Sequence, residues 1–213
     1  MKLIKVTAPL SEKLLAVFLF FLIIFCAIFY YNISNKCDDI IKYDKNDLLD
    51  THKYAVIKVD CGEIIIKINE ELSPINTKRF MTLIKNQEYD NAFFYRVIKN
   101  KYLEVGDLVY GKKNNLNYLK IGTGGSKYKN LNSELNDDFK FSKGSVGMVR
   151  RGKFDTENSQ FFILIEDDYS LNFHYTPIGK VISDLNLLKT IKHGENSSYV
   201  LRPDKINDAY IVN

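Results

Sequence analysis

The sequence is poor in cysteine: it has only Cys26, Cys37 and Cys61, and no CxxC pair. An odd number of cysteines without paired spacing does not suit a disulfide framework or a cysteine zinc site. A bridge between Cys37 and Cys61 is the one possibility outside the apolar segment that contains Cys26. The spacing does not favour that bridge.

Concentrated positive charge is also absent. The formal net charge is +4, and no block of five like charges occurs in the 213 residues. Proteins that bind nucleic acid gather lysine and arginine on one face. We therefore expect no nucleic-acid partner.

The usual motifs of metal, nucleophile and cofactor chemistry are missing. The three histidines, at positions 52, 174 and 193, are far apart, and neither HxxxH nor GxSxG occurs. The run GTGG at 122–125 has no GK[ST] after it, so it indicates a turn in a loop-rich stretch, residues 111–145, rather than a phosphate site. We expect no metal and no cofactor, so an enzyme with this sequence has to bind and polarise its substrate.

One long hydrophobic run is present. Residues 14–31 contain no charge, proline or glycine and end in Phe29, Tyr30 and Tyr31. A helix of this length rises about 27 Å, close to the hydrocarbon thickness of a bilayer, and aromatic residues favour the membrane interface. A convincing small-x-small cleavage site does not follow, so we expect an uncleaved signal anchor, although a cleaved signal peptide stays open.

The anchor divides the chain into predicted parts. Residues 1–13 form a tail, residues 32–50 a polar tether, and residues 51–213 the folded domain. Lysines are balanced on the two sides of the run, at 2, 5 and 13 before it and 36, 42 and 45 after it. We favour a single-pass protein with its N-terminus in the cytoplasm and its domain on the extracytoplasmic, periplasmic side.

The domain has mainly β patterning. Alternating runs at 54–59 and 63–68 predict a hairpin. Ser73 and Pro74 predict the start of a helix that extends to about Gln87. Further strands are expected at 146–149, 161–166, 175–182 and 209–212, with a short helix at 185–192. This order indicates an antiparallel barrel or sandwich with helices at its ends.

Arg96 is a lone cation inside the apolar run FFYRVI, residues 93–98. A guanidinium stays charged, and burying it is costly unless its donors find acceptors. Arg96 is therefore either an exposed residue on the wet face of a strand or a donor placed on the floor of a binding groove.

Six motifs occur in one order: FFYRVI (93–98), Gly106-Asp107, GTGG (122–125), SVGMV (145–149), NSQFFI (158–163) and YTPIGKVI (175–182). In order and spacing they resemble the cyclophilin-type peptidyl-prolyl cis-trans isomerases, over residues 54–212. The resemblance implies a mainly β fold, a closed eight-stranded antiparallel barrel capped by two helices. It also implies rotamase activity without a cofactor on proline-containing polypeptide clients, and we expect a monomer.

The resemblance assigns roles to individual residues. Resonance gives the peptide bond a rotation barrier of about 18–20 kcal/mol, and a donor to the prolyl nitrogen weakens that resonance. Arg96 would be this donor, Gln160 would hold the substrate backbone, and Phe162 would form the proline pocket. The other residues that we expect to bind substrate, or to support the pocket, are Phe94, Tyr102, Glu104, Met148, Val149, Leu171 and Tyr175.

The chain departs from the family at several of these positions. Lys101, Tyr102 and Glu104 stand where members usually carry Phe, Met and, two residues on, Gln. Ser170 stands where many have Trp, and Tyr175 where many have His. A weakened, cyclophilin-like proline-peptide binding module or chaperone is therefore the alternative to a full isomerase.

Overall fold

The computed structural model describes residues 9–34, 37, 48, 51–194 and 199–212. The chain forms two compact units, Met1–Asp39 and Ile40–Asn213, and each is described by itself. Most of the predicted tether, residues 32–50, lies outside the described residues, as does the beginning of the predicted tail.

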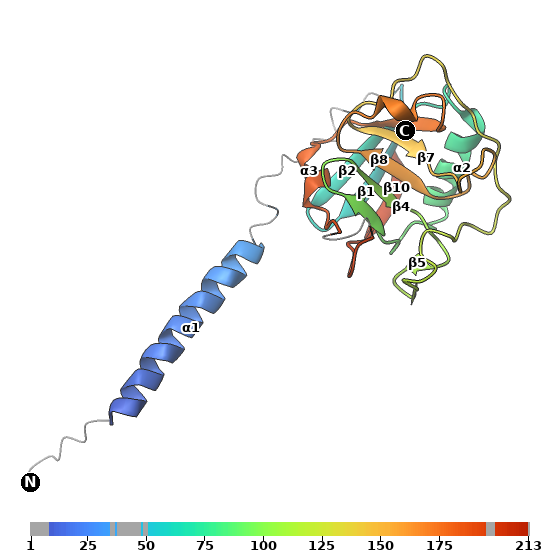
Figure 1. The fold of residues 1–213 in the computed structure, drawn as a ribbon. Helices are drawn as coiled ribbons and strands as arrows, with labels where there is room; N and C mark the ends of the chain where they lie inside the picture. The colour runs from blue at the N-terminus through green and yellow to red at the C-terminus, as the bar shows by residue number, and fades with distance from the viewer. Residues whose placement is uncertain (1–8, 35–36, 38–47, 49–50, 195–198, 213) are drawn as a thin grey trace, which may run out of the picture. The chain divides into compact units, whose positions relative to one another are not determined.

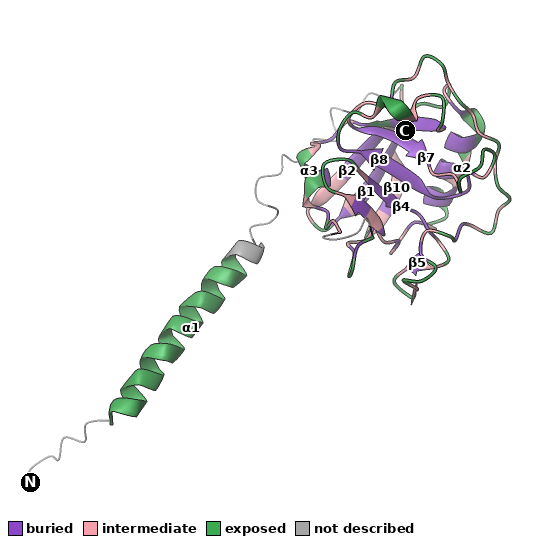
Figure 2. Cartoon of the chain, viewed as in Figure 1, coloured by how far each residue is buried: buried purple, intermediate pink, exposed green. Residues whose placement is uncertain are grey.

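The first unit is the helix α1, Leu10–Ser34 (Figure 1). It begins four residues before the predicted hydrophobic run. Its segment Leu10–Tyr31 is long and apolar enough to cross a membrane, and the side chains described along it are exposed (Figure 2). A core helix of a soluble domain would bury one face, whereas this helix buries none of its membrane-length segment. The apolar helix is therefore of the signal or anchor type.

The second unit is built on one antiparallel sheet. Its strand order is β10-β1-β2-β9-β7-β8-β4-β3. Isolated bridges pair Phe93 with Lys205 and Arg96 with Tyr199, so the segment that leads into β10 also bonds to the edge near β3. The predicted eight-stranded antiparallel barrel is confirmed. The strands are β1 (Tyr54–Val59), β2 (Gly62–Ile68), β3 (Arg96–Ile98), β4 (Tyr102–Val105), β7 (Ser145–Met148), β8 (Phe161–Leu164), β9 (Pro177–Val181) and β10 (Asp208–Val212), and a small second sheet pairs β5 (Gly111–Lys112) with β6 (Asn115–Leu116).

Among the described residues of this unit, the α-helices are α2 (Pro74–Lys85) and α3 (Asn186–Thr190), and Tyr169–Leu171 form a 3-10 turn, η3. The amide groups of Ile75 and Asn76, in the first turn of α2, donate to the carboxylate of Glu134. This contact satisfies helix amides that have no intrahelical acceptor. The helix ends before Gln87, which has a positive φ of 56°.

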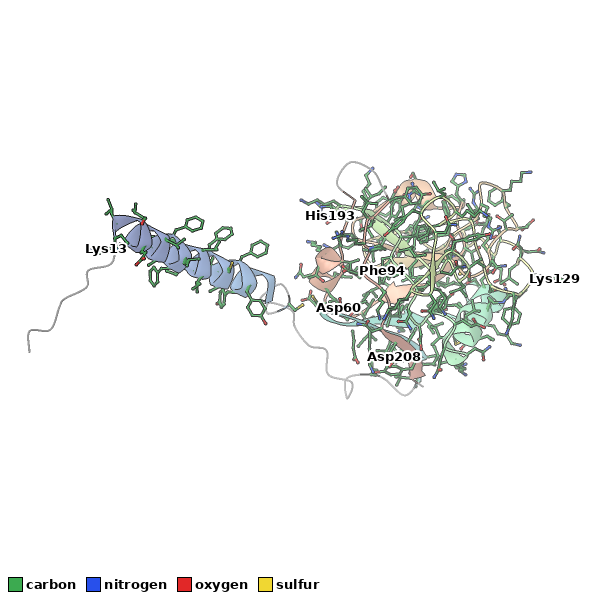
Figure 3. All side chains as sticks on the ribbon, turned by 90° about the horizontal axis from the view of Figure 1, so that it is seen from below. Lys13, Asp60, Phe94, Lys129, His193 and Asp208 are labelled. Carbon is green, nitrogen blue, oxygen red and sulfur yellow. The ribbon has the colours of Figure 1, made fainter. Side chains whose placement is uncertain are left out.

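Alternation along the strands separates the core face from the face that carries Arg96. Val97, Leu103 and Phe161 belong to the main hydrophobic core. Because successive side chains of a strand point to opposite faces, their neighbours Arg96, Glu104 and Phe162 point the other way. Figure 3 shows Phe94 in the interior of this unit, where it has no exposed surface.

The cysteines correct one expectation. Cys37 and Cys61 are disulfide-bonded, whereas Cys26 is free. Sequence spacing was a poor guide here, because a disulfide needs two Cα atoms within about 7 Å in space and places no demand on their separation along the chain.

Candidate active site

Four residues lie in one row across four strands. Arg96 of β3 is opposite Glu104 of β4, Glu104 is opposite Phe162 of β8, and Phe162 is opposite Gly147 of β7. Directly paired residues lie on the same face with their side chains in contact range. The sheet register thus brings together a cation, an acid and an aromatic ring, although Arg96 and Phe162 are 66 positions apart in the sequence.

Arg96 and Glu104 form an ion pair. Nη1 of Arg96 lies 2.9 Å from Oε1 of Glu104, and the arginine side chain is 35% exposed, against 12% for the glutamate. The guanidinium also lies over the ring of Tyr102, 5.4 Å from its centroid. Burial raises the pKa of the Glu104 carboxyl above its ordinary value, although Arg96 and Tyr95 oppose the shift. The acid that faces the guanidinium is therefore a costly charge in the folded protein.

Tyr95 connects this ion pair to Gln160. Its hydroxyl lies 2.6 Å from Oε1 of Gln160 and 3.2 Å from Oε2 of Glu104. The tyrosine is 2% exposed, and burial raises the pKa of its hydroxyl well above the ordinary value, so the hydroxyl remains a donor. We did not predict a site role for Tyr95, because its position inside an apolar run gives no signal of a polar contact.

Gln160 is held from the other side by the GTGG loop. Its Nε2 donates to the carbonyl oxygens of Gly122 and Gly124. Asp107 fixes that loop, because Oδ2 accepts from the amides of Gly122 and Gly124 at 2.7 and 2.9 Å. Its Oδ1 accepts from the amides of Val109 and Tyr110. Asp107 thus positions Gln160 indirectly. Its carboxylate holds the backbone of the GTGG loop, and the carbonyls of that loop hold the Gln160 amide.

Phe162 lies in an aromatic cluster beside the ion pair. Its ring centroid is 5.6 Å from that of Phe141 and 5.3 Å from that of Tyr175. Phe141 is a fully buried member that we did not predict, since nothing in its local sequence places it near β8. Partly buried residues that pack on this cluster include four predicted ones: Tyr102, Val149, Leu171 and Tyr175.

Two predicted residues lie in the core and not on the face that carries Arg96. Phe94 and Met148 have no exposed surface and belong to the main core. We expected these residues either to line the pocket or to support it. Because neither side chain reaches the surface, only the supporting role fits this structure. Among the departures, Lys101 and Ser170 are exposed, and Ser170 bonds to Asp168 at η3.

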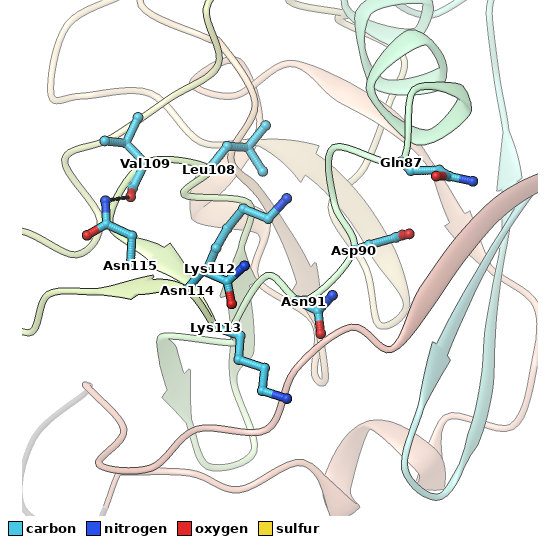
Figure 4. A pocket seen from close by; sticks show the side chains of 9 residues that line it. All are labelled: Gln87, Asp90, Asn91, Leu108, Val109, Lys112, Lys113, Asn114 and Asn115. Carbon is cyan, nitrogen blue, oxygen red and sulfur yellow. Dashed lines mark hydrogen bonds between the residues drawn. The ribbon is translucent and has the colours of Figure 1, made fainter.

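A separate cavity of about 630 Å³ lies between the end of α2 and the β5–β6 hairpin (Figure 4). It is lined mainly by polar side chains, among them Asp90, Asn91 and Lys112, and by none of the predicted catalytic residues. Within the described part of the chain, no group of three or more His, Cys, Asp or Glu could hold a metal ion. The chemistry offered at the row of Arg96 is that of a positioned cation beside an apolar surface.

Comparison with known proteins identifies the family. The family model described as "Cyclophilin type peptidyl-prolyl cis-trans isomerase/CLD" matches residues 54–211. A "Probable peptidyl-prolyl cis-trans isomerase" of Brucella abortus is 34% identical over 166 residues, which cover 76% of this chain and 84% of the relative. A peptidyl-prolyl cis-trans isomerase of Helicobacter pylori strain J99 is 31% identical over 156 residues, or 72% of this chain and 90% of the relative.

The fold has solved counterparts as well. A cyclophilin-type isomerase of Cryptosporidium parvum superposes with a TM-score of 0.66 at 24% identity, covering 76% of this chain and 98% of that one. The likeness in fold, the family match over most of the chain and the two bacterial relatives agree. The chain belongs to the cyclophilin-type peptidyl-prolyl cis-trans isomerases and has their activity, the cis-trans isomerisation of peptidyl-prolyl bonds.

Proposed function

We propose that Arg96 is the residue that lowers the rotation barrier, by donating to the prolyl nitrogen of a client polypeptide. The register that places Arg96 beside Phe162, across Glu104, supports this role. A donated proton draws the nitrogen lone pair out of amide resonance, and the adjacent apolar surface limits screening by water. Phe162 and the residues packed around it form the proline pocket, and Gln160 holds the client backbone.

One observation favours a weakened catalyst as the second candidate. The guanidinium of Arg96 pairs with an acid, Glu104, which partly cancels the positive field that a prolyl nitrogen would meet. A client therefore has to share Arg96 with Glu104. In the limit, the groove binds proline peptides and accelerates their isomerisation little.

A proline-peptide isomerisation assay on the full chain in detergent tests the assignment. We expect Arg96→Ala to lower kcat/KM by about 100-fold, as removal of one key donor does in other enzymes. Arg79→Ala is the matched control, because Arg79 bonds to the carbonyl of Lys129 away from the groove. Turnover that stays the same in Arg96→Ala would exclude this role for Arg96.

Peptide binding separates the two candidates. If the wild-type chain binds a proline peptide, loses that binding in Phe162→Ala and accelerates isomerisation no more than Arg96→Ala does, the binding module is the better description. If binding and turnover fall together in Phe162→Ala, the isomerase is the better description.

We further propose that α1 is an uncleaved single-pass anchor and that the isomerase domain acts on the extracytoplasmic side, as a monomer that assists the folding of proline-containing proteins. The membrane-length helix and the disulfide-bonded state of Cys37 and Cys61 support this location. Disulfides persist in oxidising compartments and are rare in the cytosol.

A reporter fused after Asn213 tests the orientation. We expect a reporter that works only outside the cytoplasm to be active, and one that works only in the cytoplasm to be silent. The N-terminal sequence of the mature protein tests the anchor: a chain that begins near residue 35 would show that the helix is a cleaved signal.

A further inference from the structure

Tyr95 has one hydroxyl proton and two acceptors for it. The shorter contact, 2.6 Å, is with Oε1 of Gln160, and the longer one, 3.2 Å, is with Oε2 of Glu104. The hydroxyl therefore donates its stronger hydrogen bond to Gln160 and a weaker one to Glu104. The two acceptors are the groups next to which a client must bind.

The same hydroxyl holds the Gln160 amide on the side opposite the loop. With Oε1 bonded to Tyr95, Nε2 is directed at the carbonyls of Gly122 and Gly124. Without a donor at Oε1, the amide keeps its two bonds to the loop but loses its third one, so its side chain is held less firmly.

The Tyr95 hydroxyl also contacts the carboxylate of Glu104. One carboxylate oxygen bonds to Nη1 of Arg96, and the other is shared with Tyr95. A carboxylate that loses the Tyr95 contact can turn its second oxygen to the guanidinium, since Arg–carboxylate pairs favour a two-bond geometry. The tyrosine therefore keeps the acid from engaging Arg96 more fully.

We propose that Tyr95 is a positioning residue of the isomerase: its buried hydroxyl orients Gln160 and restrains Glu104, and so couples the amide that holds the client to the guanidinium that acts on it. This inference rests on the proposed roles of Arg96 and Gln160. It assigns to Tyr95 no contact with the client.

The test compares kcat and KM of Tyr95→Phe, Glu104→Gln and the double variant, in the full chain in detergent. Tyr95→Phe should raise KM about fivefold, the size expected for one net hydrogen bond, because Gln160 loses one of the bonds that hold its side chain in place. It should also lower kcat about fivefold, because Glu104 engages Arg96 with both oxygens. In the Glu104→Gln background no carboxylate is present, so the kcat loss should disappear while the KM rise remains.

Tyr89→Phe and Glu157→Gln are matched controls outside the groove. Tyr89 is a buried tyrosine whose hydroxyl donates to the carbonyl of Ser159, and Glu157 is a buried acid bonded to Ser133 and Thr176. Both should keep KM and kcat within about twofold of the wild type.

The outcomes are distinguishable. If Tyr95→Phe lowers kcat by the same factor with Glu104 and with Gln at that position, or if Tyr89→Phe is equally damaging, the coupling through Tyr95 is refuted. If the wild-type chain turns over no faster than Arg96→Ala, the proposed role of Arg96 fails first, and the coupling fails with it.

Discussion

The ring of Phe162 lies directly over Gly147 on the neighbouring strand. A Cβ atom built at position 147 would be 2.6 Å from Cζ of Phe162 and 2.9 Å from Cε1 of Phe141. Carbon atoms do not approach this closely, so the pocket ring can adopt its place only because residue 147 has no side chain.

Gly147→Ala should therefore displace Phe162. We expect a loss of about 1–3 kcal/mol in the free energy of unfolding, as for other overpacked sites, and a rise in KM for proline peptides. Val146→Ala in the same strand faces the core and controls for lost stability alone. If both variants raise KM equally, the ring position is not what sets KM.

Glu104→Gln should change how stability depends on pH. Burial raises the pKa of Glu104 in the folded state, so the folded protein binds this proton more tightly than the unfolded chain does. The corresponding stability is present below the ordinary pKa of a glutamate and is lost as the pH rises through the raised value. A tenfold difference in proton affinity is worth about 1.4 kcal/mol.

Urea unfolding of the two proteins between about pH 4 and pH 7 measures this effect. The stability of Glu104→Gln relative to the wild type should increase with pH across this window. A constant difference would mean that Arg96 and Tyr95 fully compensate the burial of the charge.

Asp107→Asn should loosen the GTGG loop. One carboxylate accepts four backbone amides, two on each oxygen, and an Asn side chain would turn an NH₂ group toward one of these pairs. We expect a loss of about 3 kcal/mol in stability, together with a higher KM, because Gly122 and Gly124 no longer hold Gln160. Asp137→Asn, at an exposed position, should stay within about 0.5 kcal/mol of the wild type.

Thiol titration should find one reactive cysteine in the denatured chain and three after reduction, because Cys37 and Cys61 are disulfide-bonded and Cys26 is free. Reduction should lower the stability of the domain by about 3 kcal/mol. Cys26→Ser should leave the stability unchanged. Three reactive thiols in protein taken directly from cells would contradict an oxidising location.

The strands and helices with strong periodicity could be predicted from the sequence. The helix α2 and the strands β1, β8 and β9 lie within the expected ranges, and β2, β7 and β10 each begin one residue before the expected position. We did not predict β4, because Tyr102–Val105 is four residues long and carries Glu104 among apolar neighbours. It forms through pairing on both sides, with β3 and β8, which local patterning does not show.

Of the candidate site, only the residues that belong to recognisable motifs could be predicted from the sequence. Arg96, Gln160 and Phe162 are found on one face, but their roles remain predictions. Tyr95 and Phe141 could not be identified, since their contacts come from residues up to 65 and 21 positions away, Gln160 and Phe162. Phe94 and Met148 were expected near the pocket because they belong to its motifs, yet both are buried in the main core, where Met148 shares the inner face of β7 with Val146.

The row Arg96–Glu104–Phe162–Gly147 can form only after β8 has been synthesised. The four residues become neighbours only when β3, β4, β8 and β7 have all paired, and β8 ends at Leu164. A nascent chain that has not yet released β8 cannot assemble this row. If this row carries catalysis, isomerase activity should report the pairing of these four strands, and a folding intermediate in which they have not paired should be unable to act on its own prolines.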